Sequence, residues 1–388
     1  MAEAVVVHVK RTAVGKMGGV LSRYSPEKLA ACLIKNLINQ TEIDPHEVDD
    51  VILGNVVGPG GNIARLSALE AGLPLSVPGV TVDRQCGSGL EAIVMAARQI
   101  QAGAGEVYLA GGVESTSLAP WKIEKPSSVY DPAGPSFYSR ARFSPESIGD
   151  PEMGAAAENV AQEFNISRKS QDEYAYNSHQ KALHAQKEGS FAEEILAVGE
   201  VDQDECPRPG STLEKLASLP PVFQEQGTVT AGNACPLNDG AALVLVMSLK
   251  KCRQLGLNPL ARFLDSTVAG VDPNLLGIGP VPAVRKLLRR LSFQVEDVDV
   301  VEFNEAFASQ VIASLKELHI PFEKVNLSGG ALALGHPYGA SGAILVTRLL
   351  TEMRHQQFTR GLATLGIGGG MGLAAMFERM DGGELNDR

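Results

Sequence analysis

The chain has 388 residues, more than one simple hydrophobic core usually serves, so its length predicts two or three domains or one duplicated fold. Hydrophobic residues make up 44% of the sequence and charged residues 20%, a balance that excludes a disordered or fibrous protein and indicates a large buried core. The formal net charge of -11 argues against sequence-independent binding to nucleic acid, which would need a basic face.

The beginning of the chain, MAEAVVVHVKRTAVGK, has only a short apolar run before its charges. It lacks the apolar core of a signal peptide, and no later segment is apolar over the length that a membrane span needs. We therefore expect a cytoplasmic protein with no membrane partner.

The first 120 residues alternate between strand-like and helix-like patterns. Strands are predicted at residues 4–10, 51–57, 79–82 and 106–110, and helices at residues 26–40 and 87–102. Such alternation is typical of an α/β sheet that is covered by helices.

Residues 118–240 differ in composition, being rich in Pro, Ser, Gly and charge. Only one helix is convincing there, at about residues 170–189. Long irregular stretches inside a compact fold are more often binding loops or lids than passive connections, so this segment is interpreted as a functional insertion.

From residue 261 onward the first pattern returns. Three segments pair up: VDDVILGNVV at 48–57 with VDVVEFNEAF at 298–307, GVTVDRQCGSGLEAI at 79–93 with KVNLSGGALALGHPYGASGAIL at 324–345, and VYLAGGVES at 107–115 with GLATLGIGGGMG at 361–372. The separation indicates two copies of one βα unit, not short repeats. Two such halves would bring their strand-to-helix turns to one shared pocket.

The first of these turns contains Cys86, between a strand and a helix, with Gly87 and Gly89 allowing a tight bend. The five cysteines of the chain form no CxxC pair and are expected to be reduced thiols. At a helix N-terminus the pKa of a cysteine can fall from about 8.5 to below 7.5, so Cys86 is predicted to be a nucleophile. The alternative is a buried cysteine beside packing glycines.

The corresponding turn of the second half contains His336, in GHPYGASG, with Pro337 well placed for the first turn of a helix. A neutral imidazole there can accept a proton from a thiol. A lone histidine is otherwise often a capping or core group. The duplication, which brings His336 toward Cys86, favours catalysis.

Two further motifs are candidates for binding an oxyanion. NEAFA at 304–308 places Asn304 and Glu305 at the end of a strand-like run, where Asn304 could orient a water or an oxyanion, or could simply cap a helix. GIGGGMG at 366–372 could bring a backbone N–H close to a developing oxyanion, or could be a tight turn or β-bulge. It lacks the Lys-Ser/Thr of a phosphate-binding loop.

Together these motifs resemble the thiolase family. The resemblance rests on RTAVGKMGG, QCGSGLEAI, MGAAAENVA, GTVTAGN with LNDGAA, NEAFA, GGALALGHPYGASG and GIGGGMG, which follow the family's order over nearly the whole chain. It implies the layered αβαβα thiolase fold of two similar halves with an inserted loop domain. The implied limits are 1–117 for the N-terminal half, completed by about 241–260, 118–240 for a loop domain that binds coenzyme A, and 261–388 for the C-terminal half.

The resemblance also implies roles for single residues. Cys86 would take the acyl group and His336 would activate it. Asn304 would hold the water that completes one oxyanion hole with His336, and the backbone N–H groups of Cys86 and Gly368 would form the other.

For coenzyme A, the resemblance places Met153 and Phe307 along the pantetheine channel, and Arg208 near the nucleotide, where a planar cation can stack on adenine or pair with phosphate. Arg208 is otherwise a solvated surface residue. Cys235 replaces a serine that touches pantetheine in the family, on the loop-domain side of the channel.

The sequence departs from the family at a position with a direct chemical role. Biosynthetic and degradative thiolases carry a second cysteine directly before IGGGMG, where it moves the proton of the substrate carbon or leaving thiol, but this chain has Gly366. General acid/base groups typically contribute a factor of about a hundred to ten thousand, so we expect Cys86 to be acylated but condensation or thiolysis to be slow. Cys235, across the channel, is not expected to replace the missing thiol.

The sequence therefore predicts an acyl-CoA acyltransferase of the thiolase type, with acyl-CoA and coenzyme A as substrates and no metal or redox cofactor. Two alternatives stay open. One is a thiolase-like thioesterase or transferase without carbon–carbon chemistry, and the other is a non-catalytic acyl-CoA-binding or assembly subunit. The resemblance implies a homodimer or homotetramer.

Overall fold

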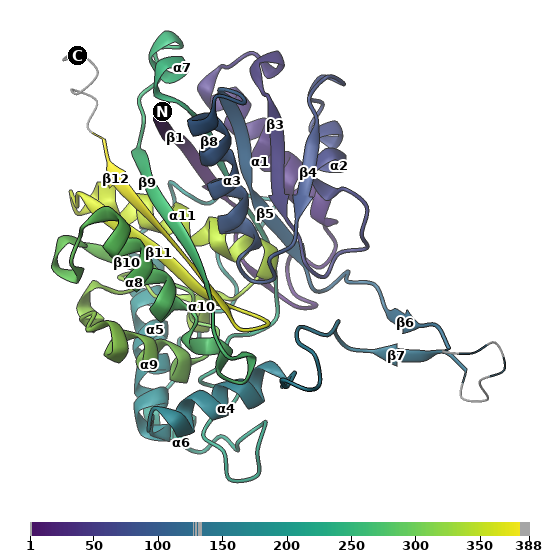
Figure 1. Ribbon diagram of the computed structural model, residues 1–388, viewed down its shortest axis with the longest axis vertical. Coiled ribbons are helices and arrows are strands. Elements are labelled where there is room, and N and C mark those ends of the chain that lie inside the picture. Colours follow the sequence, from purple (N-terminus) through teal and green to yellow (C-terminus); the bar gives the residue numbers. More distant parts are fainter. Residues whose placement is uncertain (1, 127, 129, 131–133, 381–388) are drawn as a thin grey trace.

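The computed structural model describes residues 2–126, 128, 130 and 134–380 (Figure 1). Its strands are β1 (Ala4–Arg11), β2 (Gly15–Lys16), β3 (Asp50–Gly54), β4 (Gly79–Val82), β5 (Val107–Ser115), β6 (Lys122–Glu124), β7 (Ser136–Tyr138), β8 (Asn238–Ser248), β9 (Ala261–Gly270), β10 (Val300–Phe303), β11 (Arg360–Ile367) and β12 (Met371–Arg379). Its α-helices are α1 (Pro26–Thr41), α2 (Ile63–Glu70), α3 (Ser88–Ala102), α4 (Met153–Glu163), α5 (Arg168–Lys187), α6 (Leu213–Ala217), α7 (Leu249–Gln254), α8 (Pro280–Leu291), α9 (Ala308–Leu318), α10 (Ala331–Leu334) and α11 (Tyr338–His355).

The strand order repeats the duplication that the sequence predicts. On one side of the sheet, β3 runs parallel to β4 and β5, and β5 is followed by the antiparallel strands β8 and β1. On the other side, β10 runs parallel to β11, which is followed by the antiparallel strands β12 and β9. The two series meet where Val5 and Val6 of β1 pair with Arg262 and Ala261 of β9. The structure therefore contains two copies of one strand arrangement, joined where β1 pairs with β9.

Helices α3 and α11 form the layer between the two series of strands. Their apolar residues share one core with residues of β1, β8, β11 and β12. α1 packs its buried face, which includes Leu29 and Leu33, on the outside of the first series. α8 and α9 do the same for the second series. The order of layers is thus helix, sheet, helix, sheet, helix, which confirms the predicted fold class.

The N-termini of α3 and α11 approach so closely that only glycine fits between them. A Cβ atom added at Gly89 would lie 2.7 Å from the carbonyl oxygen of Gly339, and one added at Gly112 would lie 1.8 Å from it. Glu114 of β5 accepts a hydrogen bond from the backbone N–H of Gly339 at 3.0 Å, which ties the first half to the start of α11. These contacts fix the turns that precede both helices.

Most predicted elements of the first half are confirmed with small changes at their ends. The strand predicted at 79–82 is β4 and the helix at 26–40 is α1, one residue longer. The strand predicted at 51–57 ends at Gly54, because the side chain of Asn55 turns to donate to Val113 and Glu114 at 2.9 Å.

The segment 118–240 contains more regular structure than its composition predicts. The helix expected at 170–189 is α5, which begins two residues earlier because Ser167 caps it by accepting a hydrogen bond from the N–H of Ser170. Before it, α4 lies in MGAAAENVAQE, a helix that the sequence interpretation missed. The predicted domain limits remain predictions, and residues 1, 127, 129, 131–133 and 381–388 within them lie outside the described part.

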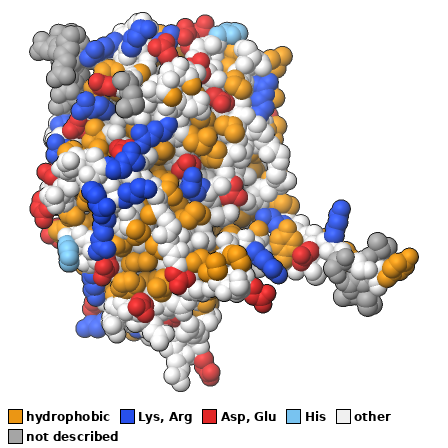
Figure 2. Space-filling model, viewed as in Figure 1, with side chains coloured by type: hydrophobic (Ala, Val, Ile, Leu, Met, Phe, Trp, Pro, Cys, Tyr) orange, Lys and Arg blue, Asp and Glu red, His pale blue; other side chains and the backbone are white. Residues whose placement is uncertain are grey.

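The hairpin of β6 and β7 projects from the body of the protein (Figure 1) and carries exposed hydrophobic side chains (Figure 2). Trp121 is 87% exposed and Phe137 is 68% exposed, with their rings 5.9 Å apart. Apolar groups gathered on a projection are typical of a contact surface. The expected homo-oligomer stays a prediction. No helix among the described residues is long and apolar enough to cross a membrane.

A buried ionic network joins β1 and α11 to the inserted segment. Arg11 contacts Asp204 at 2.7 Å and Glu194 at 2.8 Å, and all three side chains are at most 1% exposed. On the far side of Glu194, Arg348 contacts Glu194 and Glu352, both at 2.6 Å. Each of the two guanidinium groups therefore bridges two carboxylates within the protein interior.

We predict that Arg11→Met lowers the free energy of unfolding by about 3–5 kcal/mol, because it leaves two buried carboxylates short of a partner. The matched control is Lys16→Met, since Lys16 pairs with Glu205 at 3.2 Å but is 61% exposed. This control should cost less than about 1 kcal/mol. Urea unfolding of both variants measures the difference, and equal midpoints for the two variants would contradict the prediction.

Candidate active site

Cys86 and His336 occupy corresponding turns in the two halves. Each lies two residues before the first residue of its central helix, Ser88 for α3 and Tyr338 for α11. Since the N-termini of these helices touch through Gly89 and Gly339, the structure brings the two turns to one region of the molecule. The predicted meeting of the two motifs has this physical basis.

The turn at Cys86 is held in a strained conformation. Gln85, directly before it, has a φ of 46°, in the left-handed region that a side chain disfavours. Its N–H donates to Asp83 at 2.8 Å, and the hydroxyl of Ser88 donates to its carbonyl oxygen at 2.6 Å. Strain of this kind at the turn before a helix is how a nucleophile is presented away from its own backbone.

The thiol of Cys86 is protonated in the unliganded protein. Burial raises its pKa to about 11, and the backbone N–H groups of Gly368 and of Cys86 itself, which hydrogen-bond the sulfur, only partly offset this. The pKa below 7.5 that its place at a helix N-terminus predicts is therefore wrong. The loss of water outweighs the helix end, so nucleophilic attack needs a base.

His336 is a neutral imidazole that can act as the base for the thiol of Cys86. It is 2% exposed, and burial lowers its pKa to about 4. Its backbone N–H donates to Asn238 at 2.8 Å, and its Nδ1 lies 2.6 Å from the hydroxyl oxygen of Ser341. Because that hydroxyl donates to the carbonyl oxygen of Pro337 at 3.0 Å, it accepts from Nδ1–H, which leaves the lone pair on Nε2.

Tyr338 joins the two turns. Its ring packs edge-on against the imidazole of His336, with the centroids 5.1 Å apart. Burial raises the pKa of its hydroxyl, as do the nearby thiols of Cys235 and Cys86. The tyrosine therefore lies near the histidine and both cysteines.

Asn304 follows the last residue of β10 and does not cap a helix, since α9 begins at Ala308 after Phe307. Asn304 is 1% exposed, and its Nδ2 lies 3.4 Å from Nε2 of His336, as the oxyanion interpretation requires. The carboxylate of the neighbouring Glu305 is instead used in hydrogen bonds that hold the fold together.

The carboxylate of Glu305 accepts four hydrogen bonds. The donors are the hydroxyls of Tyr174 and Ser178 on α5, the side chain of Asn326 and the N–H of Leu332, at 2.7 to 3.1 Å. Glu305 therefore anchors α5 to the second half.

Gly368 stands in the turn between β11 and β12, where Gly369 and Gly370 have φ values of 84° and 78°. These positive values favour glycine. The turn directs the N–H of Gly368 to the sulfur of Cys86, where it joins the N–H of Cys86. The two candidate oxyanion donors thus converge on one atom.

The residues expected along the pantetheine channel lie on the inserted segment and beside it. Met153 begins α4, and Phe307 packs edge-on against Phe223 with ring centroids 6.3 Å apart. Phe223 also covers Gly154, where a Cβ would lie 2.2 Å from its ring. Sequence interpretation missed Phe223, although an aromatic residue in the polar stretch PVFQEQGT was a usable signal.

Cys235 lies near the Cys86 turn, whereas Arg208 contacts a different part of the inserted segment. The N–H of Cys235 donates to the carbonyl oxygen of Ala306 at 3.0 Å. Burial and the proximity of Cys86 raise the pKa of Cys235, so the two thiols are neighbours. Arg208 is exposed on the inserted segment, where its N–H donates to His179 at 3.3 Å. Among the described residues, the contacts of Arg208 do not reach either catalytic turn.

At Gly366, where the resemblance predicts a second thiol, another side chain approaches. A Cβ added there would lie 2.5 Å from Nε2 of Gln310. Gln310 is 1% exposed, and this Nε2 has no hydrogen-bond partner among the described residues. The amide of Gln310 therefore fills space that a cysteine would need.

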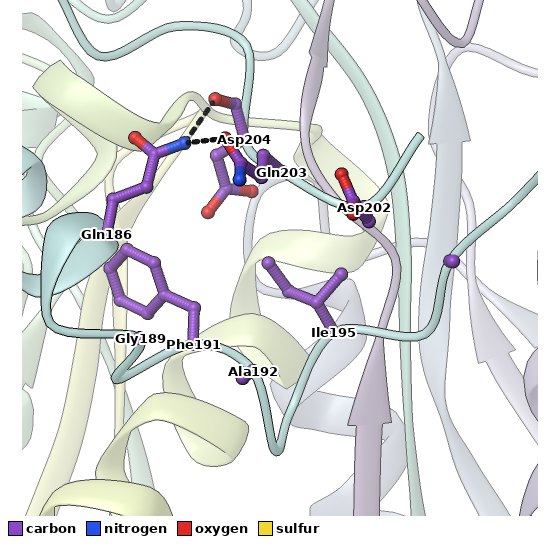
Figure 3. Close-up of a pocket in the computed structure, with 9 residues that line it drawn as sticks. Gln186, Gly189, Phe191, Ala192, Ile195, Asp202, Gln203 and Asp204 are labelled. Carbon is purple, nitrogen blue, oxygen red and sulfur yellow. Dashed lines mark hydrogen bonds between the residues drawn. The ribbon is translucent and has the colours of Figure 1, made fainter. Parts of the chain in front are cut away.

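Of two cavities in the structure, one borders the Cys86 turn and the other lies away from the candidate site. One of about 550 Å³ is lined by Gly368, Gln85 and Arg142 and opens beside the Cys86 turn. The pocket drawn in Figure 3, of about 270 Å³, lies over Phe191 and Asp204, and none of the candidate site residues lines it. Among the described residues, no group of three or more His, Cys, Asp or Glu side chains could hold a metal ion.

Comparison with known proteins identifies the family that the chain matches and a solved structure with the same fold. The family model for the thiolase N-terminal domain matches residues 4–250, and that for the thiolase C-terminal domain matches residues 257–379. A protein of Staphylococcus epidermidis named putative acetyl-CoA C-acetyltransferase VraB is 52% identical over 386 residues, which cover 98% of this chain and 100% of the relative. The protein of the same name from Staphylococcus aureus is 50% identical over 383 residues, with 98% and 100% covered. The crystal structure of the Bacillus anthracis acetyl-CoA acetyltransferase superposes with a TM-score of 0.93 at 40% identity, covering 98% of this chain and 99% of that one.

We predict that alkylation of Cys86 by iodoacetamide accelerates about tenfold per pH unit between pH 7 and 9, since only the thiolate reacts. With the pKa raised to about 11, thiolate is scarce at pH 7 and its share grows as the pH rises. Mass spectrometry of the peptide that contains Cys86 gives the rate, with Cys86→Ser as the control. A rate that does not change with pH would instead indicate a preformed thiolate–imidazolium pair.

Proposed function

This chain belongs to the thiolase family, and on that premise we propose that it is an acyl-CoA C-acyltransferase that carries the acyl group on Cys86. The relatives named acetyl-CoA C-acetyltransferase support an acetyl thioester of coenzyme A as the substrate, and a 3-ketoacyl thioester belongs to the same proposal. The observation that carries the proposal is the convergence of two backbone N–H groups on the sulfur of Cys86, beside a neutral buried imidazole.

In the first half-reaction, Nε2 of His336 takes the proton of the Cys86 thiol while the sulfur attacks the thioester carbonyl carbon. The negative charge on the carbonyl oxygen is held by the N–H groups of Cys86 and Gly368, a contribution of about a hundredfold or more in rate for each donor. When the tetrahedral intermediate collapses, the carbon–sulfur bond to coenzyme A breaks. The departing thiolate takes the proton from His336, so the base is restored.

In the second half-reaction Nε2 of His336 takes the proton of the coenzyme A thiol, whose sulfur attacks the acyl carbonyl carbon. The carbon–sulfur bond to Cys86 then breaks, and the Cys86 thiolate takes the proton back from His336. Alternatively, the α-carbon of an acyl-CoA accepts the acyl group. Nδ2 of Asn304 lies 3.4 Å from Nε2 of His336, so the two can share one water or, once Nε2 has taken a proton, one oxygen of the substrate. Attack by carbon also requires removal of an α-proton. Gly366 provides no group for that step, so we propose that acyl transfer to sulfur is retained and the carbon–carbon step is slow.

We propose that coenzyme A lies along the inserted segment. Met153, Phe307 and Cys235 would line the channel for pantetheine, with Phe223 as an additional wall, because its ring contacts both Gly154 and Phe307. Arg208, being exposed, is free to meet the nucleotide. The domain limits 118–240 for this segment and a homodimeric or homotetrameric state belong to the same proposal.

A second candidate function is favoured by one observation, the glycine at position 366. A protein without the second thiol could be a thioesterase, in which water accepts the acyl group, or a passive acyl-CoA-binding subunit. These differ from the first proposal in the fate of the acyl group, which can be measured.

We predict that acetyl-CoA leaves one acetyl group on Cys86, detected by mass spectrometry of the quenched protein. Cys86→Ser should abolish the adduct, and His336→Ala should slow its formation about a hundred- to ten-thousandfold, the usual contribution of a general base. Binding of acetyl-CoA without any adduct would support a passive subunit instead. An adduct that disappears at the same rate with and without added coenzyme A would support a thioesterase.

We predict that Gly366→Cys raises thiolysis of acetoacetyl-CoA about a hundredfold or more, by supplying the missing acid/base group. The new Cβ must displace the amide of Gln310, which is feasible because it is the end of a flexible side chain. Gly366→Ala is the matched control, since it adds the same Cβ without a thiol. If both variants leave the rate unchanged, another group already moves this proton.

A further inference from the structure

Glu302 is a buried acid that the proposed reaction does not use. It lies on β10 two residues before Asn304, and it is 1% exposed. Its Oε1 has no hydrogen-bond partner among the described residues. A buried polar atom without a partner is costly, so its presence calls for a hydrogen bond from something other than these side chains.

A small cavity lies beside this carboxyl group. Its volume is about 20 Å³, and Glu302, Asn304, Ser341 and Arg348 all line it. The Nε of Arg348 is a second buried atom without a partner among the described residues. A cavity of this size has room for one water molecule, which needs two to four polar partners. Most of the lining is apolar, and Glu302, Asn304, Ser341 and Arg348 are the lining residues whose side chains can supply those partners.

The charges around Glu302 favour its neutral form. Burial, together with the negative charges of Glu352, Glu194 and Glu305, raises its pKa well above the ordinary value, and Arg348 opposes this only in part. Arg348 is already engaged by Glu194 and Glu352, both at 2.6 Å. Both terminal nitrogens of Arg348 face other carboxylates, so a charged Glu302 would meet only its Nε, and the neutral form of Glu302, which can donate a hydrogen bond, is favoured.

We propose that Glu302 is a positioning residue that acts through one buried water on Ser341 and Asn304, and through them on His336. Ser341 contacts Nδ1 of His336 at 2.6 Å, and Asn304 contacts Nε2 at 3.4 Å, so the cavity touches both groups that orient the imidazole. The water also links the imidazole to Arg348 and hence to the buried ionic network. This inference rests on the proposed function.

The consequence is a fixed direction for the imidazole. The hydroxyl of Ser341 must keep donating to Pro337 for Nδ1 to stay protonated, and the amide of Asn304 must keep facing Nε2. A water held by Glu302 and Arg348 supplies each of them with a further partner in a set geometry. Misplacement of a catalytic group by about 1 Å can cost about a hundredfold in rate.

The test compares Glu302→Gln, which keeps the size and the capacity to donate a hydrogen bond, with Glu302→Leu, which keeps the size alone. The matched control is Thr351→Val, because Thr351 is buried on α11, about one turn beyond Arg348, and its hydroxyl donates to the carbonyl oxygen of Thr347 at 2.9 Å. The rate of Cys86 acylation by acetyl-CoA, kcat and KM, and the pH dependence of kcat are measured for each.

We expect Glu302→Leu to lower the acylation rate about 10- to 100-fold while KM stays within about twofold, and Glu302→Gln and Thr351→Val to stay within about threefold of the unchanged enzyme. The pH dependence of kcat should be the same in Glu302→Gln as in the unchanged enzyme. An unaltered rate in Glu302→Leu would overturn the proposal. So would a loss in Glu302→Gln as large as that in Glu302→Leu, because it would show that an ionisable proton matters and not the hydrogen bond.

A second measurement keeps the proposal testable if Glu302→Leu does not fold. A crystal structure of the unchanged protein at atomic resolution should show one water within hydrogen-bond distance of Glu302 and of Ser341 or Asn304, and its absence would overturn the proposal. Failure of the proposed function is recognised separately. In that case the unchanged enzyme itself forms no adduct on Cys86.

Discussion

The rest of the structure depends on the close contact between the N-termini of the two central helices. Gly89 and Gly112 meet the carbonyl oxygen of Gly339 at distances that leave no space for a Cβ. Glu114 then crosses from the first half to accept from the N–H of Gly339. Because Cys86 and His336 each lie just before one of these helices, this contact determines where the nucleophile and the base stand. Every proposed step of the chemistry depends on that placement.

The price of this placement is burial of the reacting groups. Loss of water raises the pKa of Cys86 to about 11 and lowers that of His336 to about 4, so both are neutral before substrate binds. Neither group is activated by its charge, and catalysis must come from hydrogen-bond geometry that becomes favourable in the transition state. The same holds for Glu302, a buried acid that we propose acts by hydrogen bonding and not by charge.

Much of the fold could be predicted from the sequence, because the duplicated segments carry their pattern locally. VDDVILGN and VDVVEFNE share one alternation of apolar residues, and the structure makes them β3 and β10 in equivalent places. The turns at Cys86 and His336 were visible because glycines surround them. The αβαβα layers and the thiolase family followed from these motifs, and the comparisons confirm both.

What could not be predicted depends on contacts between distant segments. The desolvation of Cys86 overrides its helix N-terminus, and no local motif reports how much water is lost. The approach of Gln310 to Gly366 and the cavity shared by Glu302 and Ser341 likewise join segments separated in the chain. The helix α4 was missed because its surroundings are rich in loops.

The central claim is that one cleft holds the sulfur of Cys86 and the imidazole of His336 around a single acyl group. A crystal structure of the protein trapped with acetyl-CoA tests it most directly. The account predicts an acetyl group on Sγ of Cys86, with its carbonyl oxygen about 2.7–3.1 Å from the N–H groups of Cys86 and Gly368. It also predicts that Nε2 of His336 lies within hydrogen-bond reach of that sulfur or of the thiol of coenzyme A. An unmodified Cys86 with acetyl-CoA bound elsewhere, or an imidazole facing another region, would contradict the account.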